Sequence, residues 1–254
     1  MNEADSYVAQ WLAREPAMEL ALLFCVPGER RCVALWGCLQ HELDDAAFNL
    51  SDATVTQAKL AWWADELQRG TVGAARHPLL RELFEQPATR GIGARTWAAA
   101  AQQALALALD EQGPADVDGL LQRYLPYASA LAAIESALFG EPSAAEALAV
   151  ERIVRRLGGA GGPRVAAEWP LQLLARHQLG REALAAGAAA AALRRDIAAP
   201  LLARLPSAAA APRHRRMRQA LDAWRLQQWL RGRDAPAPAG WRRLWLLWRA
   251  ARAT

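Results

Sequence analysis

The acidic side chains in the first fifth of the sequence are the first candidates for chemistry. Glu42, Asp44, Asp45 and Asp52 follow one another within a short stretch. Glu42 and Asp45 are three residues apart, a spacing that places two side chains on one face of a helix. Carboxylate oxygens are ligands that Mg²⁺ prefers. The pair is therefore a candidate metal site and ligand site, although a solvated helix face accounts for the same spacing equally well.

A second group of candidates lies in residues 59–67, Lys-Leu-Ala-Trp-Trp-Ala-Asp-Glu-Leu. Lys59, the only lysine, stands one helical turn before Trp63 and could meet an anionic head group. Trp62 and Trp63 could line an apolar pocket. The alternatives are that both tryptophans pack against neighbouring helices and that Lys59 pairs with an acid such as Glu66.

Helices must position these side chains, because the chain is rich in alanine and leucine and poor in strand formers. Hydrophobic residues make up 53% of it, which is ample for one core. Periodicity and Pro/Gly punctuation predict an all-α, single-domain bundle of about ten helices over residues 1–254. The expected helices cover about 6–25 (interrupted at Pro16), 30–47, 53–69, a short segment from Pro78, 94–111, 116–139, 142–157, 164–179, 181–204, 213–232 and 240–252.

The order of motifs in the first third resembles the squalene/phytoene synthase family. The matching block runs from Ala34 through Glu42-Leu43 and Asp45 to residues 59–67, Gly70 and His77-Pro-Leu-Leu-Arg-Glu-Leu83. Residues 124–140 and 244–252 are similar to later family segments, more loosely. The resemblance implies an isoprenoid (terpenoid) synthase-like fold. It also implies Mg²⁺-dependent, head-to-head condensation of two prenyl diphosphates in the active members.

The acids that this chemistry requires are incomplete. Active members carry two DxxxD motifs, since Mg²⁺ must neutralise the departing pyrophosphate. Neither motif is present here. In the region where the second should stand, from Gly158 to Arg195, the only acids are Glu168 and Glu182. Glu42-Leu43 resembles the family's non-catalytic branch, which is related to factors that assist assembly of respiratory complex I.

The sequence therefore predicts a catalytically degenerate family member, a pseudoenzyme. It would bind an isoprenoid-like or lipidic ligand, such as a prenyl diphosphate, or a protein partner. The alternative is an active prenyltransferase that condenses farnesyl or geranylgeranyl diphosphate. No cofactor is expected in the first case, and Mg²⁺ is expected in the second.

The C-terminal segment is strongly basic. Residues 213–254 hold eleven arginines against Asp222 and Asp234, a net charge of +9 that leaves −5 for the rest of a chain of net charge +4. In the helix expected at 240–252, Trp241, Leu244, Trp245 and Trp248 form an apolar stripe, flanked by arginines that include Arg242 and Arg249. Such a helix suits peripheral membrane contact or a protein partner. Docking of the stripe onto the bundle is the preferred interpretation because the helix is short. Nucleic-acid binding is not expected, because the arginines come without a known binding motif.

The cysteines and the N-terminus bear on location. Cys25, Cys32 and Cys38 cannot all pair, and no CxxC is present, so buried thiols in a reducing compartment are expected. No signal peptide or membrane-spanning stretch is visible. The predicted location is cytoplasmic, with peripheral attachment to the inner membrane left open.

Overall fold

The computed structural model describes residues 3–160, 165–181, 184, 188–234 and 237–253. Over these ranges the protein consists of twelve α-helices with short 3₁₀ and π segments and contains no strand. The all-α prediction is confirmed. The finer assignment to the isoprenoid synthase-like folds stays a prediction.

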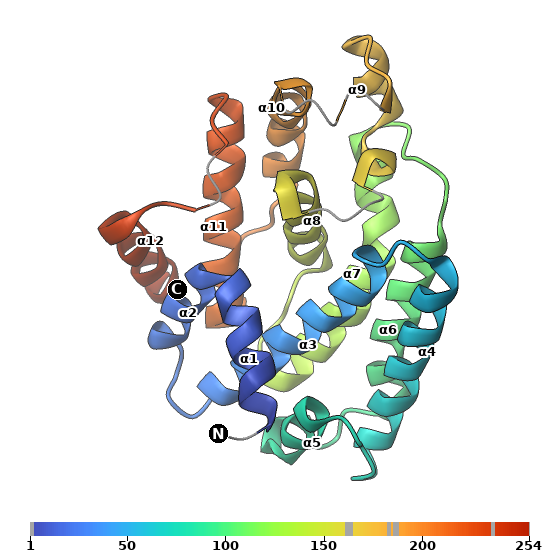
Figure 1. Ribbon diagram of the computed structural model, residues 1–254. Helices are drawn as coiled ribbons and strands as arrows, with labels where there is room; N and C mark the ends of the chain where they lie inside the picture. Colours follow the sequence, from blue (N-terminus) through green and yellow to red (C-terminus); the bar gives the residue numbers. More distant parts are fainter. Residues whose placement is uncertain (1–2, 161–164, 182–183, 185–187, 235–236, 254) are drawn as a thin grey trace.

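Figure 1 shows the order and arrangement of the helices. They are α1 (Glu3–Arg14), α2 (Pro16–Phe24), α3 (Arg30–Phe48), α4 (Ala53–Gly70), α5 (Pro78–Glu85), α6 (Ala94–Leu109), α7 (Val117–Phe139), α8 (Ala145–Arg155), α9 (Leu171–Arg176), α10 (Ala188–Ala203), α11 (Arg213–Leu230) and α12 (Gly240–Arg252). The 3₁₀ turns η1 (Pro87–Thr89) and η3 (Val165–Glu168) and the π segment η2 (Arg156–Ala160) complete the described structure.

Local sequence signals set several helix starts. Asp52 is the N-cap of α4, and its side chain accepts hydrogen bonds from the backbone N–H groups of Thr54 and Val55. Proline occupies the first turn of α2 and of α5, where its missing N–H would have no partner within the helix. Pro16 thus divides the segment 6–25 into two helices.

Two expected helices are shorter than predicted. α8 begins at Ala145 rather than at Pro142, because the chain before it is held against α7: the Ser143 N–H donates to Ser136 Oγ at 2.9 Å. The segment 164–179 contains η3 and the short α9, with Pro170 at the N-cap of α9. Residue 164 of this segment and residues 182, 183 and 185–187 of the segment expected at 181–204 lie outside the described residues.

α3 lies at the centre of the bundle. It contacts α1, α2, α4, α5 and α6, and most of its side chains are buried. α7 passes beside it and contacts α6, α8 and α10 (Figure 1). α11 contacts α2, α8, α10 and α12. The core therefore joins the first and last parts of the chain.

The C-terminal helix does dock, but not through the predicted stripe. α12 contacts α11 and α2, and its buried residues are Leu247 and Ala251. Trp241, Trp245 and Trp248 are exposed. The preferred interpretation, in which the tryptophan stripe packs on the bundle, is therefore wrong: the smaller side chains of a neighbouring face make the contact instead.

The three cysteines are buried and unpaired, as predicted. Burial raises the pKa of Cys25 and Cys32 to about 11, so these thiols are poor nucleophiles at neutral pH. None of the helices described in the structure is both long and apolar enough to cross a bilayer.

Candidate functional site

A pocket of about 350 Å³ opens where the end of α1 and the last turns of α3 meet the end of α8. Charged side chains dominate its lining. The lining residues are Arg14, Glu15, His41, Asp44, Asp45, Phe48, Asn49, Arg152, Arg155 and Arg156.

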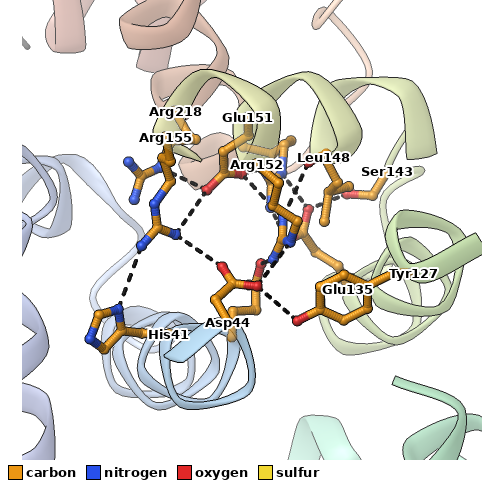
Figure 2. Close-up of polar contacts among 12 residues, drawn as sticks. His41, Asp44, Tyr127, Glu135, Ser143, Leu148, Glu151, Arg152, Arg155 and Arg218 are labelled. Atoms are coloured by element: carbon orange, nitrogen blue, oxygen red, sulfur yellow. Dashed lines mark hydrogen bonds and ion pairs between the residues drawn. The ribbon is translucent and has the colours of Figure 1, made fainter. Parts of the chain in front are cut away.

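Helical spacing explains why the two walls have opposite charge. On α3, His41, Asp44, Asp45 and Phe48 stand at i, i+3, i+4 and i+7 and share one face. On the other wall, Arg152, Arg155 and Arg156 stand at i, i+3 and i+4. Figure 2 shows the carboxylate of Asp44 pointing from α3 toward the arginines of α8. The pocket thus lies between an acidic helix face and a basic one.

Asp44 is the carboxylate that ties the walls together. The Tyr127 hydroxyl donates to Asp44 Oδ1 at 2.9 Å, and Arg155 Nη1 donates to Asp44 Oδ2 at 3.3 Å. Arg152 Nε lies 3.4 Å from Asp44 Oδ1. Burial, and then the charge of Asp44, raises the pKa of Tyr127 well above its ordinary value. Tyr127 therefore remains a proton donor to Asp44 rather than a base.

Arg155 also connects the pocket to α1 and α11. Its Nε lies 3.0 Å from Glu15 Oε1, and Arg218 Nη1 of α11 lies 2.8 Å from Glu15 Oε2. Burial by itself would raise the pKa of Glu15, but the charges of Arg218 and Arg155 lower it to about 2. Glu15 is therefore ionised at neutral pH and holds both guanidinium groups in place.

Behind the pocket the same network continues into the core. Arg215 of α11 bonds to both oxygens of Glu135, with Nε–Oε1 2.8 Å and Nη2–Oε2 2.7 Å, and it also binds Glu151. The indole N–H of Trp36 donates to Glu135 at 2.9 Å. Glu135 is fully buried, and although burial opposes its charge, Arg215 and His214 lower its pKa well below the ordinary value. This inner part is a fixed framework for the pocket wall (Figure 2).

Arg156 has hydrogen-bonding capacity left over. Its Nε donates to Glu168 at 2.8 Å, and its guanidinium lies 4.4 Å from the ring centroid of Phe48. Its Nη1 is buried and has no hydrogen-bond partner among the described residues. A buried guanidinium N–H without an acceptor costs free energy, so an acceptor that came within reach of Nη1 would gain a charge-assisted hydrogen bond.

A second pocket of about 340 Å³ adjoins the first, and Phe48 and Arg156 line both. Charged side chains such as Asp110 and Arg181 contribute to its lining. Its apolar lining is Ala47, Phe48, Ala53, Leu107, Ala108, Leu109, Ala166 and Ala167. Arg156 therefore stands at the boundary between the charged pocket and a pocket that combines these apolar side chains with charged ones.

The structure brings three of the predicted site residues together. Lys59 Nζ lies 3.8 Å from Asp45 Oδ2, and Asp45 also contacts Arg14 at 3.4 Å. Burial raises the pKa of Glu42, and the nearby charge of Lys59 opposes that rise. Of Glu42, Asp45 and Lys59, Asp45 alone lines the charged pocket. Asp44, which is not part of the predicted pair of Glu42 and Asp45, takes the central position in the charged pocket.

The two tryptophans of α4 lie elsewhere. Trp63 is buried and Trp62 is 43% exposed, and both contact His77, with ring centroids 4.9 and 5.8 Å away. Neither of them lines the charged pocket or its apolar neighbour. They join α4 to the start of α5, which agrees with the packing alternative.

The donor set of the pocket does not suit Mg²⁺. A cluster of magnesium ions would need acids on both walls, whereas the wall facing α3 carries Arg152, Arg155 and Arg156. Asp44 and Asp45 are already paired with cationic side chains. Over the described residues, no three His, Cys, Asp or Glu side chains gather as metal ligands. Glu168 is bonded to Tyr124 and Arg156, and Glu182 lies outside the described residues.

Comparison with known proteins matches the chain to no family model, no curated protein and no solved structure. The resemblance of the Ala34–Leu83 block to the squalene/phytoene synthases therefore remains a hypothesis that rests on the residues themselves.

Proposed function

We propose that the protein is a non-catalytic binding protein for an amphiphilic anion, such as a prenyl diphosphate or another lipidic phosphate. The phosphate would lie against the arginines of α8 in the charged pocket, and the hydrocarbon chain in the adjoining apolar pocket. The observation that carries the proposal is Arg156, which lines both pockets and whose buried Nη1 has no hydrogen-bond partner among the described residues.

Charge supports an anionic ligand. The charged pocket has four arginines (Arg14, Arg152, Arg155 and Arg156) against three carboxylates (Glu15, Asp44 and Asp45), an excess of one positive charge. Burial and the neighbouring Arg155 lower the pKa of His41, so this residue adds no charge at neutral pH. Planar guanidinium groups match the geometry of phosphate oxygens.

Size and polarity support an attached hydrocarbon chain. Each pocket, at 340–350 Å³, is within the range of small-molecule sites, and the second one adds a cluster of alanine and leucine side chains beside the charged pocket. Phe48, with Arg156 over its ring, separates the two parts. A diphosphate and its first carbons could therefore be held by adjacent residues.

The same charges argue against ionisation of the ligand. Breaking an allylic carbon–oxygen bond requires the leaving pyrophosphate to be neutralised by metal ions held on carboxylates. In the charged pocket, the carboxylates of Asp44 and Glu15 instead form ion pairs with Arg152 and Arg155. Binding without turnover is the function that this arrangement fits.

Calorimetric titration with farnesyl diphosphate and with inorganic pyrophosphate, each in EDTA and in Mg²⁺, tests the proposal. We expect both to bind without Mg²⁺, farnesyl diphosphate more tightly. Arg156→Gln should weaken both ligands about tenfold or more, since a charged hydrogen bond is lost. Arg90→Gln, an exposed arginine outside both pockets, is the matched control.

A second variant tests the binding of the hydrocarbon chain separately from that of the diphosphate. Ala167→Trp places a large side chain in the apolar pocket and should weaken farnesyl diphosphate while leaving inorganic pyrophosphate unchanged. The proposal is overturned if neither farnesyl diphosphate nor inorganic pyrophosphate binds. Mg²⁺-dependent release of pyrophosphate from farnesyl diphosphate overturns it in favour of an active prenyltransferase.

A further inference from the structure

α12 leaves a large apolar surface uncovered. Trp241 is 71% exposed, Trp245 49%, Trp248 42% and Leu244 41%. These four residues stand at i, i+3, i+4 and i+7, so they form one continuous stripe along the helix. The helix is held to α11 and α2 by another face, through Leu247 and Ala251. Exposed tryptophans in such a stripe mark a surface that contacts something apolar.

The arginines beside the stripe pair with no acid in the part of the chain that the structure describes. Arg242, Arg249 and Arg252 stack on Trp241, Trp245 and Trp248, with 5.8, 5.4 and 4.7 Å from guanidinium carbon to ring centroid. Among the residues that the structure describes, no carboxylate forms an ion pair with any of the three, and α12 itself contains no acid. The surface is therefore both apolar and positively charged.

The combination of exposed tryptophans and arginines indicates what kind of partner binds this surface. A tryptophan carries an apolar ring and a polar N–H, and it is most stable at the boundary between hydrocarbon and water. Arginines along the flank of the stripe would then lie at the level of the lipid phosphates. A buried protein interface would instead have to remove three unpaired guanidinium groups from water.

We propose that α12 is a docking surface for a bilayer that contains anionic phospholipids, and that it binds lying flat, with its tryptophan stripe toward the lipid. At 1.5 Å per residue its 13 residues span about 20 Å, enough to lie in the interface and too short to cross it. α11 and α2 fix the orientation of the stripe before contact. The inference is independent of the proposed ligand pocket.

Flotation of the full chain with vesicles tests the surface. The vesicles are phosphatidylcholine alone, or phosphatidylcholine with about 30% phosphatidylglycerol, at low salt and at about 0.5 M NaCl. We expect binding to the anionic vesicles that falls roughly tenfold or more at high salt. Little binding to the neutral vesicles is expected, because the arginines then have no anionic head group to attract them.

Two matched pairs of variants assign the binding to α12. Trp241→Ala/Trp245→Ala/Trp248→Ala should lose it, whereas Trp62→Ala, which removes a tryptophan of α4 about as exposed as Trp248, should retain it. Arg242→Gln/Arg249→Gln should bind roughly tenfold less, and Arg90→Gln/Arg95→Gln, with the same change in net charge on exposed residues, should bind normally.

Three results would overturn the proposal. The first is the absence of binding to the anionic vesicles. The second is an equal loss of binding in both charge variants, which would show attraction by net charge alone. The third is self-association that the tryptophan variant abolishes without any vesicle binding, which would identify a second copy of the chain as the occupant.

Discussion

The arginines of α8 and α11 and the arginines of α12 occupy opposite environments. Arg152 and Arg215 are buried and surrounded by carboxylates from α3, α7 and α8. Arg242 and Arg249 are exposed, stack on tryptophans and pair with no described acid. Arg152 and Arg215 hold helices together through these carboxylates, whereas Arg242 and Arg249 are available to an external ligand. The number of arginines in a segment therefore says little about their role until burial and pairing are known.

Removal of a buried arginine should produce the largest effect. Arg215→Met would leave Glu135 and Glu151 as buried carboxylates without their main partner. Loss of one side of such a pair costs about 3–5 kcal/mol. We expect urea unfolding to show a decrease of that size in the free energy of unfolding.

An exposed ion pair supplies the control for Arg215. Arg204 pairs with Asp118, and both side chains are at least half exposed. Arg204→Gln should change the free energy of unfolding by less than about 1 kcal/mol. Similar losses in the two variants would show that burial does not distinguish the two kinds of arginine.

Asp222 tests the same network through pH. Burial, and then the charge of Glu151, raises its pKa from 3.8 to about 7, and Oδ2 has no hydrogen-bond partner among the described residues. Folding favours the protonated form of Asp222. Its contribution to the free energy of unfolding is therefore complete below pH 4 and is lost as the pH rises through 7. A shift of this size corresponds to about 4 kcal/mol.

Asp222→Asn mimics the protonated form and should remove this dependence. We expect the variant to become progressively more stable than the unchanged protein as urea unfolding is repeated from pH 4 to pH 8. The comparison between the two proteins cancels the titration of the other groups. A stability difference that is independent of pH would contradict the assignment.

A smaller effect on the free energy of unfolding is expected at Asp45, in the lining of the charged pocket. Asp45 is 27% exposed and lies 3.4 Å from Arg14 and 3.8 Å from Lys59. Asp45→Asn should reduce the free energy of unfolding by less than about 1 kcal/mol, because solvent screens both contacts. The loss should shrink further in about 0.5 M NaCl. A loss as large as that of Arg215→Met would place Asp45 in the buried framework.

Local signals in the sequence were sufficient for the helices. Asp52 as an N-cap, Pro16 and Pro78 in first turns, and the apolar periodicity of α3 and α4 each depend on residues a few positions apart. Such signals act within one element, so they predict its limits. The predicted start of α8 at Pro142 was wrong. The helix begins after Pro142 because of contacts with α7, which lie outside the segment.

The site could be predicted only in part, because it depends on which helix faces meet. Asp45 and Lys59 were found from their types, but Asp44 joins Arg155, 111 positions away, and Glu135 joins Arg215, 80 positions away. α3 is buried on most of its surface, so its hydrophobic pattern does not reveal which acid points toward α8. The spacing of Arg152, Arg155 and Arg156 on one face was the signal that could have identified the opposite wall.

The smallest effect on stability should come from α12, where the comparison is sharpest. Arg242→Gln/Arg249→Gln removes charges that hold no carboxylate, so the melting temperature should change by less than about 2 °C. The same variant should lose most vesicle binding, so stability and function separate at this helix. Differential scanning calorimetry beside flotation measures both quantities on one preparation. A large fall in melting temperature would mean that these arginines also hold the bundle together, and the division between structural and available arginines would then fail.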